Sequence, residues 1–379
     1  MKYTILTAIT IFGVLISSIV PCFNQPVWYA QYLGLLFFLC LGISVVIWDF
    51  DKILSAFSLF ALLSAFFITS LAPRAIVLLF QINLSLLACY GISKFNAKQR
   101  KIVCWAILGV VILQYVWITL QYFNIDPIFK SLIRQGHSEV VGFNGAKDQL
   151  GSFFAITFPI VLGTCPVLIP LSLIGLFLAK SSFAFISAII SGLIYLYYTN
   201  KKYFKVFIML IIISSVLFFK YADNPKFADF ETRGNVWKHS VKATIEGKIN
   251  IENNNQKLEL KTKPIYGYGL GNFLRIFPFV PQQDGFNYVN EKFEHAHNDF
   301  VEFFFEFGWI GLALLTVFAF SFVSSFLASG KTQEIVLYFS SLIAYFLNAN
   351  GNFLSHLGFS GMMLIVLYSL YRGSLNVKR

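Results

Sequence analysis

Charged residues are scarce in this chain: they make up 12% of its 379 residues, whereas hydrophobic residues make up 57%. Soluble domains carry about 25% charged residues. This deficit excludes an ordinary soluble domain and predicts a membrane protein. The net charge of +11 would indicate nucleic-acid binding only if the basic residues clustered on a soluble face. Along the sequence they do not, so we expect no nucleic-acid partner.

Cysteine is also sparse, and the five cysteines form no Cys-x-x-Cys pair. They are scattered through apolar runs, so we interpret them as small buried residues and not as metal ligands. Internal repeats and low-complexity tracts are lacking as well. Gly267, Gly269 and Gly271 alternate, but without the strand–helix context of a nucleotide-binding motif. We expect these glycines to let the backbone approach the membrane or a ligand closely.

Long apolar runs are what the chain has in abundance, and about 20 residues suffice to cross a bilayer. They predict an all-α polytopic membrane protein with about 12 transmembrane helices. The first run is interpreted as a retained helix and not as a cleaved signal peptide. The pair 150–164 and 167–179 is short enough to form one re-entrant hairpin instead. The candidate spans are 3–20, 28–48, 53–72, 75–92, 102–120, 150–164, 167–179, 183–199, 205–220, 298–327, 334–349 and 354–371.

Three regions follow from these spans: helices 1–9 in residues 1–220, one long polar loop in 221–296, and helices 10–12 in 297–379. Short segments on the side of the termini hold 13 Lys and Arg residues, against 5 on the other side. This bias predicts cytoplasmic termini and an extracytoplasmic long loop. Within that loop we expect a helix over 232–244 and a flexible polar excursion over 249–263.

The junction 294–306 concentrates polar residues where the long loop enters an apolar span. Ionisable groups at membrane depth are costly, so the junction indicates a functional site. Asn298 is predicted to cap the helix, and His297 lies just before it, at the water boundary. A nearby carboxylate is expected to raise the pKa of His297 and to orient its ring. Three acids follow at i, i+3 and i+7 on one helix face: Asp299, Glu302 and Glu306.

Two motifs carry a family resemblance. The first consists of His297-Asn298, Glu302, Glu306, Gly308 and Gly311. The second consists of Arg233, Trp237, Pro264, Gly267, Gly269, Gly271, Asn272 and Phe273. In order and spacing they resemble the O-antigen ligase and polymerase superfamily of bacterial envelope glycosyltransferases. The motifs cover roughly 233–312, and the rest of the chain is similar only in hydropathy and loop placement.

The resemblance implies a GT-C-like fold and transfer of a glycan from an undecaprenyl-diphosphate-linked donor to an acceptor. It implies inversion at the anomeric carbon, no cofactor, no nucleotide donor and no required metal. Arg233 would bind the diphosphate and stabilise the leaving group, and His297 would take the proton of the acceptor hydroxyl. Lys180 stands near the place of a family arginine and is either its substitute or a snorkelling lysine. The further substrate-binding candidates are Trp237, Gly269, Asn298, Glu302 and Glu306.

Several interpretations stay open. The acceptor is lipid A-core for a ligase, a glycan repeat for a polymerase, or a protein hydroxyl. One dominant loop favours the ligase. The chain ends at Arg379 without a large soluble domain, which disfavours protein glycosylation. A transporter of the same lipids is the rival class, although polarity concentrated at one junction favours an enzyme. The site is expected to face the periplasm from the bacterial inner membrane.

Neighbouring polar residues have less specific interpretations. His295 is interpreted as a surface neighbour, and zinc held by both histidines and Glu302 is the disfavoured alternative. His239 is interpreted as a loop residue. The segment 142–153 matches a Gly-rich family stretch weakly, and we interpret it as a solvated loop. The asparagines at 348, 350 and 352 either line the site or cap helices.

The predicted topology places Asn254 and Arg379 on opposite sides of the membrane. Single cysteines at residue 254 and after Arg379, in a background without native cysteines, should react differently with an impermeant thiol reagent. Labelling of both positions from the same side would contradict the orientation.

Overall fold

The computed structural model describes residues 2–19, 82, 85–86, 88–125, 140–144, 146–209, 227–253, 256–280, 295–352, 354 and 358–376. Within these residues the protein is mostly helical, as predicted. The predicted spans 28–48 and 53–72 lie outside the described residues, as do large parts of 75–92 and 205–220.

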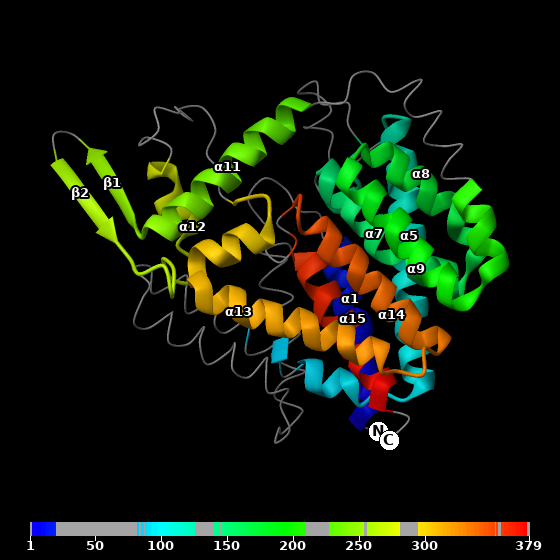
Figure 1. The fold of residues 1–379 in the computed structure, drawn as a ribbon. Coiled ribbons are helices and arrows are strands. Elements are labelled where there is room, and N and C mark those ends of the chain that lie inside the picture. The colour runs from blue at the N-terminus through cyan, green and yellow to red at the C-terminus, as the bar shows by residue number, and fades with distance from the viewer. Residues whose placement is uncertain are drawn as a thin grey trace.

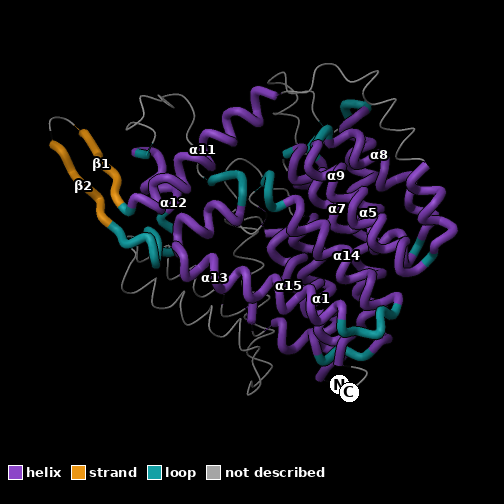
Figure 2. The backbone as a smooth tube through the Cα atoms, in the orientation of Figure 1, coloured by secondary structure: helices purple, strands orange, loops and turns teal. Residues whose placement is uncertain are grey.

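A helical bundle forms the larger part of the molecule (Figures 1 and 2). Helix α14 packs against α7, α9 and α15, and α1 packs against α5 and α15. One continuous apolar core runs through these helices. Its helices are α1 (Lys2–Ile19), α5 (Ala97–Tyr122), α7 (Lys147–Thr164), α8 (Ile169–Ala179), α9 (Ser182–Thr199), α14 (Gln333–Asn348) and α15 (Gly358–Asn376).

Three described helices are long and apolar enough to cross a membrane: α5, α9 and α13 (Asp299–Leu327). Shorter apolar helical segments cover Leu6–Leu15 and Pro166–Ala179. The total of about 12 spans stays a prediction. The start of α1 and the end of α15 lie together at the foot of the bundle in Figure 1, far from the strands.

The long polar loop folds into a second layer with its own apolar core. It contains α11 (Phe227–Glu246), β1 (Lys248–Asn253), β2 (Gln256–Lys261), α12 (Phe273–Ile276) and the 3-10 turn η4 (Phe277–Phe279). Val236, Tyr268, Phe273 and Phe305 meet in this core. Because Phe305 belongs to α13, the start of that helix packs with the loop layer and ties it to the bundle.

The flexible excursion predicted over 249–263 is wrong, because Lys248–Asn253 and Gln256–Lys261 pair as antiparallel strands. Ile249 pairs with Leu260 and Ile251 with Leu258. Apolar residues alternate with polar ones along both strands, which is the signature of a strand with one covered face. The hairpin also means that the described chain is not all-α. The helix predicted over 232–244 is confirmed, and it extends from Phe227 to Glu246.

Helix α13 is broken at Gly308, whose φ of 59° and ψ of −151° are not helical. The segment 264–269 crosses the break and exchanges backbone hydrogen bonds with both sides of it. The amides of Tyr268 and Gly269 donate to the carbonyls of Phe305 and Glu306, at 3.0 and 2.8 Å. The amides of Trp309 and Ile310 donate to the carbonyls of Pro264 and Ile265, at 3.1 and 2.9 Å. Groups freed by the break are thereby paired again, as an apolar environment requires.

Gly267, the first of the alternating glycines, is explained by this docking. A Cβ on Gly308 would lie 2.2 Å from the Pro264 carbonyl oxygen, and one on Gly267 would lie 2.6 Å from the Gly308 nitrogen. We expected the alternating glycines to allow close approach to the membrane or a ligand. In the structure Gly267 allows close approach to the backbone of α13 instead, and Gly269 and Gly271 have positive φ.

We expect Gly308→Ala to lower the free energy of unfolding by roughly 2–3 kcal/mol or more. A Cβ collides with backbone there, and the positive φ adds strain. Thermal unfolding in detergent measures this change. Gly109→Ala on α5 is the control, because nothing lies within 4 Å of its new Cβ. Equal melting temperatures for both variants would contradict the docking.

Candidate active site

Arg233 on α11 bridges two segments of the bundle. Its Nη2 donates to Asp148 Oδ2 at 3.0 Å, and its Nη1 donates to the carbonyl oxygen of Gly351 at 2.7 Å. The Arg233 side chain is 19% exposed and that of Asp148 is 31% exposed. The guanidinium is therefore held at a fixed place, and solvent still reaches it.

Asp148 is positioned by a buried amide network on α5. Gln121 Oε1 accepts from the amides of Val141 and Gly142, at 3.0 and 2.8 Å. Gln114 accepts from the Phe143 amide and donates to Asn144 Oδ1, at 2.9 and 2.6 Å. These bonds hold the turn η2 (Gly142–Asn144) against α5, directly before α7 begins. The interpretation of 142–153 as a solvated loop is therefore wrong.

The loop 295–297 is held from two sides. Trp237 Nε1 donates to the Ala296 carbonyl at 2.8 Å. Glu302 Oε2 accepts from the Ala296 amide, and its Oε1 hydrogen bonds with His295 Nδ1, both at 3.0 Å. His295 is therefore packed, with its side chain 15% exposed, and the prediction of a surface neighbour is wrong. His297, between these anchors and α13, has a left-handed backbone with φ of 51°.

Asn298 caps α13, as predicted. Its Oδ1 accepts from the amides of Phe300 and Val301, at 3.0 and 3.2 Å. Its Nδ2 donates to the Asn350 carbonyl at 3.0 Å, so the cap is also attached to the turn after α14. Asn352 in the same turn donates to Ser152 on α7 at 3.2 Å. The Asn298 and Asn352 side chains therefore join the site to the bundle through the turn after α14.

The environment of His297 disfavours its charged form. Burial, followed by the positive charges of Arg233 and His295, lowers the pKa of His297 to about 4. The charges of Asp148 and Glu302 act in the opposite direction, but they are outweighed. The carboxylates act in the expected direction, but the expectation of a raised pKa for His297 is wrong. Desolvation and like charge exceed the carboxylate effect.

Three other candidates occupy different surroundings. Lys180 is exposed in the left-handed turn after α8, beside Ser181, which packs near Gly151 of α7. Gly269 donates its amide to the Glu306 carbonyl, and the buried Glu306 side chain accepts from the Phe273 amide at 3.2 Å. Substrate contacts of these three residues stay a prediction.

His239 differs from its interpretation as a loop residue, because it is buried on α11 and only 5% exposed. Within the described ranges, no group of three or more His, Cys, Asp or Glu side chains is placed to hold a metal ion. The zinc alternative gains no support from that part of the chain.

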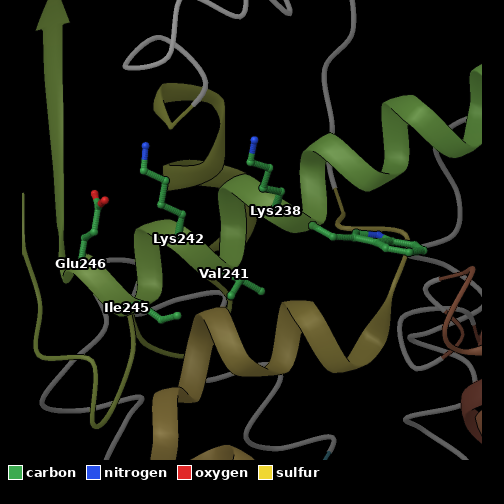
Figure 3. Close-up of a pocket in the computed structure, with 6 residues that line it drawn as sticks. Lys238, Val241, Lys242, Ile245 and Glu246 are labelled. Carbon is green, nitrogen blue, oxygen red and sulfur yellow. The ribbon is translucent and has the colours of Figure 1, made fainter.

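A groove of about 480 Å³ lies along α11 and is lined by residues between Trp237 and Glu246 (Figure 3). Its residues form two adjacent stripes at helical spacing. Trp237, Val241 and Ile245 make an apolar stripe, and the other stripe contains Lys238, Lys242 and Glu246. The two amines point away from Val241 and Ile245 in Figure 3. The groove surface is therefore mainly apolar, and two lysines and one glutamate lie beside it, near the residue that anchors Ala296.

Comparison with known families supports the resemblance seen in the sequence. Residues 167–316 match the family model described as O-antigen ligase. The matched segment contains Lys180, both sequence motifs and the break in α13, but it begins after Asp148. No curated protein matches the chain. The resemblance to the O-antigen ligase superfamily is thereby confirmed.

We expect Asn298→Ala to cost about 1–2 kcal/mol of stability, because the helix loses its N-cap. The stability of Asn298→Asp should lie between that of Asn298→Ala and that of the wild type. A carboxylate still caps the helix, but it cannot donate to the Asn350 carbonyl. Chemical unfolding followed by tryptophan fluorescence measures the series. Equal stability of all three proteins would show that the cap does not anchor the turn.

Proposed function

Starting from the match of residues 167–316 to O-antigen ligases, we propose that this protein is a multi-pass glycosyltransferase of the bacterial inner membrane. It moves a glycan from undecaprenyl diphosphate onto lipid A-core, at a site that faces the periplasm. One observation carries the proposal: Arg233 donates to the carbonyl of Gly351, and the adjacent Asn350 carbonyl accepts from Asn298, the residue after His297. A phosphate-binding cation and a neutral base thus share one site.

Each group has a defined part in the proposed reaction. The acceptor hydroxyl oxygen attacks the anomeric carbon from the face opposite the diphosphate, so the configuration inverts. The hydroxyl proton passes to the imidazole of His297. The bond between the anomeric carbon and the phosphate oxygen breaks, and its electron pair leaves with undecaprenyl diphosphate. Arg233 stabilises that leaving group through charge-assisted hydrogen bonds.

The lowered pKa of His297 suits one requirement of a base and opposes another. With a pKa of about 4, the imidazole is neutral at physiological pH and ready to accept a proton. A base with so low a pKa is weak, however, since efficiency is greatest when the pKa lies near the working pH. A donor diphosphate beside Arg233 would offset the positive charge that lowers the pKa. The base is therefore expected to strengthen when the donor binds.

The groove on α11 favours lipid A-core among the acceptors. Its apolar stripe and its lysines, Lys238 and Lys242, suit an amphipathic acceptor with negative charge. Such a molecule, following the groove to Trp237, would reach the loop that holds His297. A glycan repeat on a second carrier lipid, as in a polymerase, is the alternative occupant. An uncharged protein hydroxyl would form no charge-assisted contact with the amines of Lys238 and Lys242.

The rival class, a transporter of lipid-linked glycans, also needs a cation for the diphosphate. It does not need a base next to that cation. The glycosyltransferase-like character of the matched family favours the enzyme. The junction of Arg233, His297 and Glu302 adds to that support, because it places a candidate base beside a candidate phosphate-binding cation.

The experiment that tests the function is in vitro transfer with His297→Ala. Loss of a general base costs typically 10²–10⁴-fold in rate, while undecaprenyl diphosphate should still bind. In the wild type, kcat/KM for the donor should stay flat from about pH 7 to about pH 5, because a base with a pKa near 4 is not yet protonated there. An ordinary histidine would lose activity below about pH 6.5.

Lys248→Ala is the matched control, because Lys248 is exposed on the hairpin, outside the site. It should keep the activity and the pH profile of the wild type. Full activity of His297→Ala would overturn the role of the base. A fall of kcat/KM near pH 6.5 would show that the imidazole titrates as an unperturbed histidine.

A further inference from the structure

Asp148 is the charged partner of Arg233, and neither sequence motif includes it. It lies in the first turn of α7, which begins before the segment matched to the O-antigen ligase family. Its Oδ2 accepts from Arg233 Nη2 at 3.0 Å. The buried amide network of α5 holds η2, directly before this turn, in place. The fold thus holds a carboxylate against the cation assigned to the donor diphosphate.

We propose that Asp148 is a positioning residue that occupies the anion-binding position on Arg233 until the donor diphosphate displaces it. The proposal rests on the proposed function, and it concerns the donor site of the same reaction. A diphosphate carries more negative charge than one carboxylate and binds guanidinium bidentately. It can therefore replace Asp148 at Nη2, while the Gly351 carbonyl keeps Nη1 in place.

Partial exposure makes this exchange feasible. The Asp148 side chain is 31% exposed and Arg233 is 19% exposed, so water can solvate the carboxylate when it leaves the pair. Breaking a fully buried pair would leave an uncompensated charge, which is far more costly. A partly exposed pair is weak enough for a competing anion to open.

The displaced carboxylate has a second role, because its charge also acts on His297. Burial has the largest effect on the pKa of that imidazole, and four charged or titratable groups also act on it: Arg233 from α11, His295 from the loop, Asp148 from α7 and Glu302 from α13. Asp148 favours the protonated form. Released from Arg233, it would stabilise the imidazolium that forms when His297 takes the acceptor proton. One residue would thereby link donor arrival to the strength of the base.

Asp148→Asn tests the proposal through a split between affinity and rate. Undecaprenyl diphosphate in nanodiscs should bind the variant up to about fivefold more tightly, the scale of a partly exposed ion pair, because no carboxylate competes for Arg233. The kcat for transfer should fall, because the imidazolium loses its partner. Asp148→Glu, which keeps the charge, should restore much of both values.

Two controls separate this role from a structural one. Lys248→Ala removes an exposed charge on the hairpin, outside the site and the groove, and should change neither value. In an Arg233→Ala background, Asp148→Asn should no longer tighten binding, because the guanidinium for which the carboxylate and the diphosphate compete is gone. Thermal unfolding confirms that each variant is folded.

The outcomes are distinct. Equal or weaker binding of undecaprenyl diphosphate to a folded Asp148→Asn, with normal binding to the wild type, would overturn the proposal and leave the proposed function standing. If Asp148→Glu behaves like Asp148→Asn, the proposal is likewise overturned and the proposed function stands. If the wild type does not bind undecaprenyl diphosphate, the proposed function fails, and the positioning role fails with it.

Discussion

The break of α13 at Gly308 is the constraint on which the rest of the structure depends. A helix interrupted inside an apolar layer leaves carbonyls and amides without partners, and each would cost several kcal/mol in hydrocarbon. The segment 264–269 removes this cost with backbone hydrogen bonds to both sides of the break. Only glycine at 267 and 308 leaves room for the two backbones to approach so closely. The long loop is thereby fastened to the bundle by main chain and not by side chains alone.

The candidate site follows from that attachment. The half of α13 before Gly308 places Phe305 in the core of the loop layer, while Asn298 at its start is bonded to the turn after α14. Arg233 on α11 then bonds to the turn after α14, and Trp237 on the same helix bonds to the loop directly before α13. Two separate cores therefore hold the residues around His297. A site built this way can keep its geometry although it lies at the boundary between a polar and an apolar layer.

The sequence predicts the helical class, the cap at Asn298 and the grouping of Arg233 with His297, because each depends on local patterns or on a family motif. It does not reveal Asp148, whose partner is 85 residues away and whose position depends on Gln114 and Gln121 of another helix. The hairpin could have been found from the alternation of Ile249, Ile251, Leu258 and Leu260. The direction of the pKa shift at His297 could not have been predicted from the sequence, since burial is a property of the assembled fold.

The electrostatics of the site favour an order of events. Without donor, Arg233 and burial keep His297 neutral but weakly basic, so water or an early acceptor hydroxyl meets a poor base. A bound diphosphate changes the charge beside the imidazole in the direction that favours the imidazolium. In the proposed reaction, the glycan would then still be attached to its carrier when the base reaches its working strength. Donor binding before acceptor activation would require no moving lid, because the charge of the donor itself would complete the site.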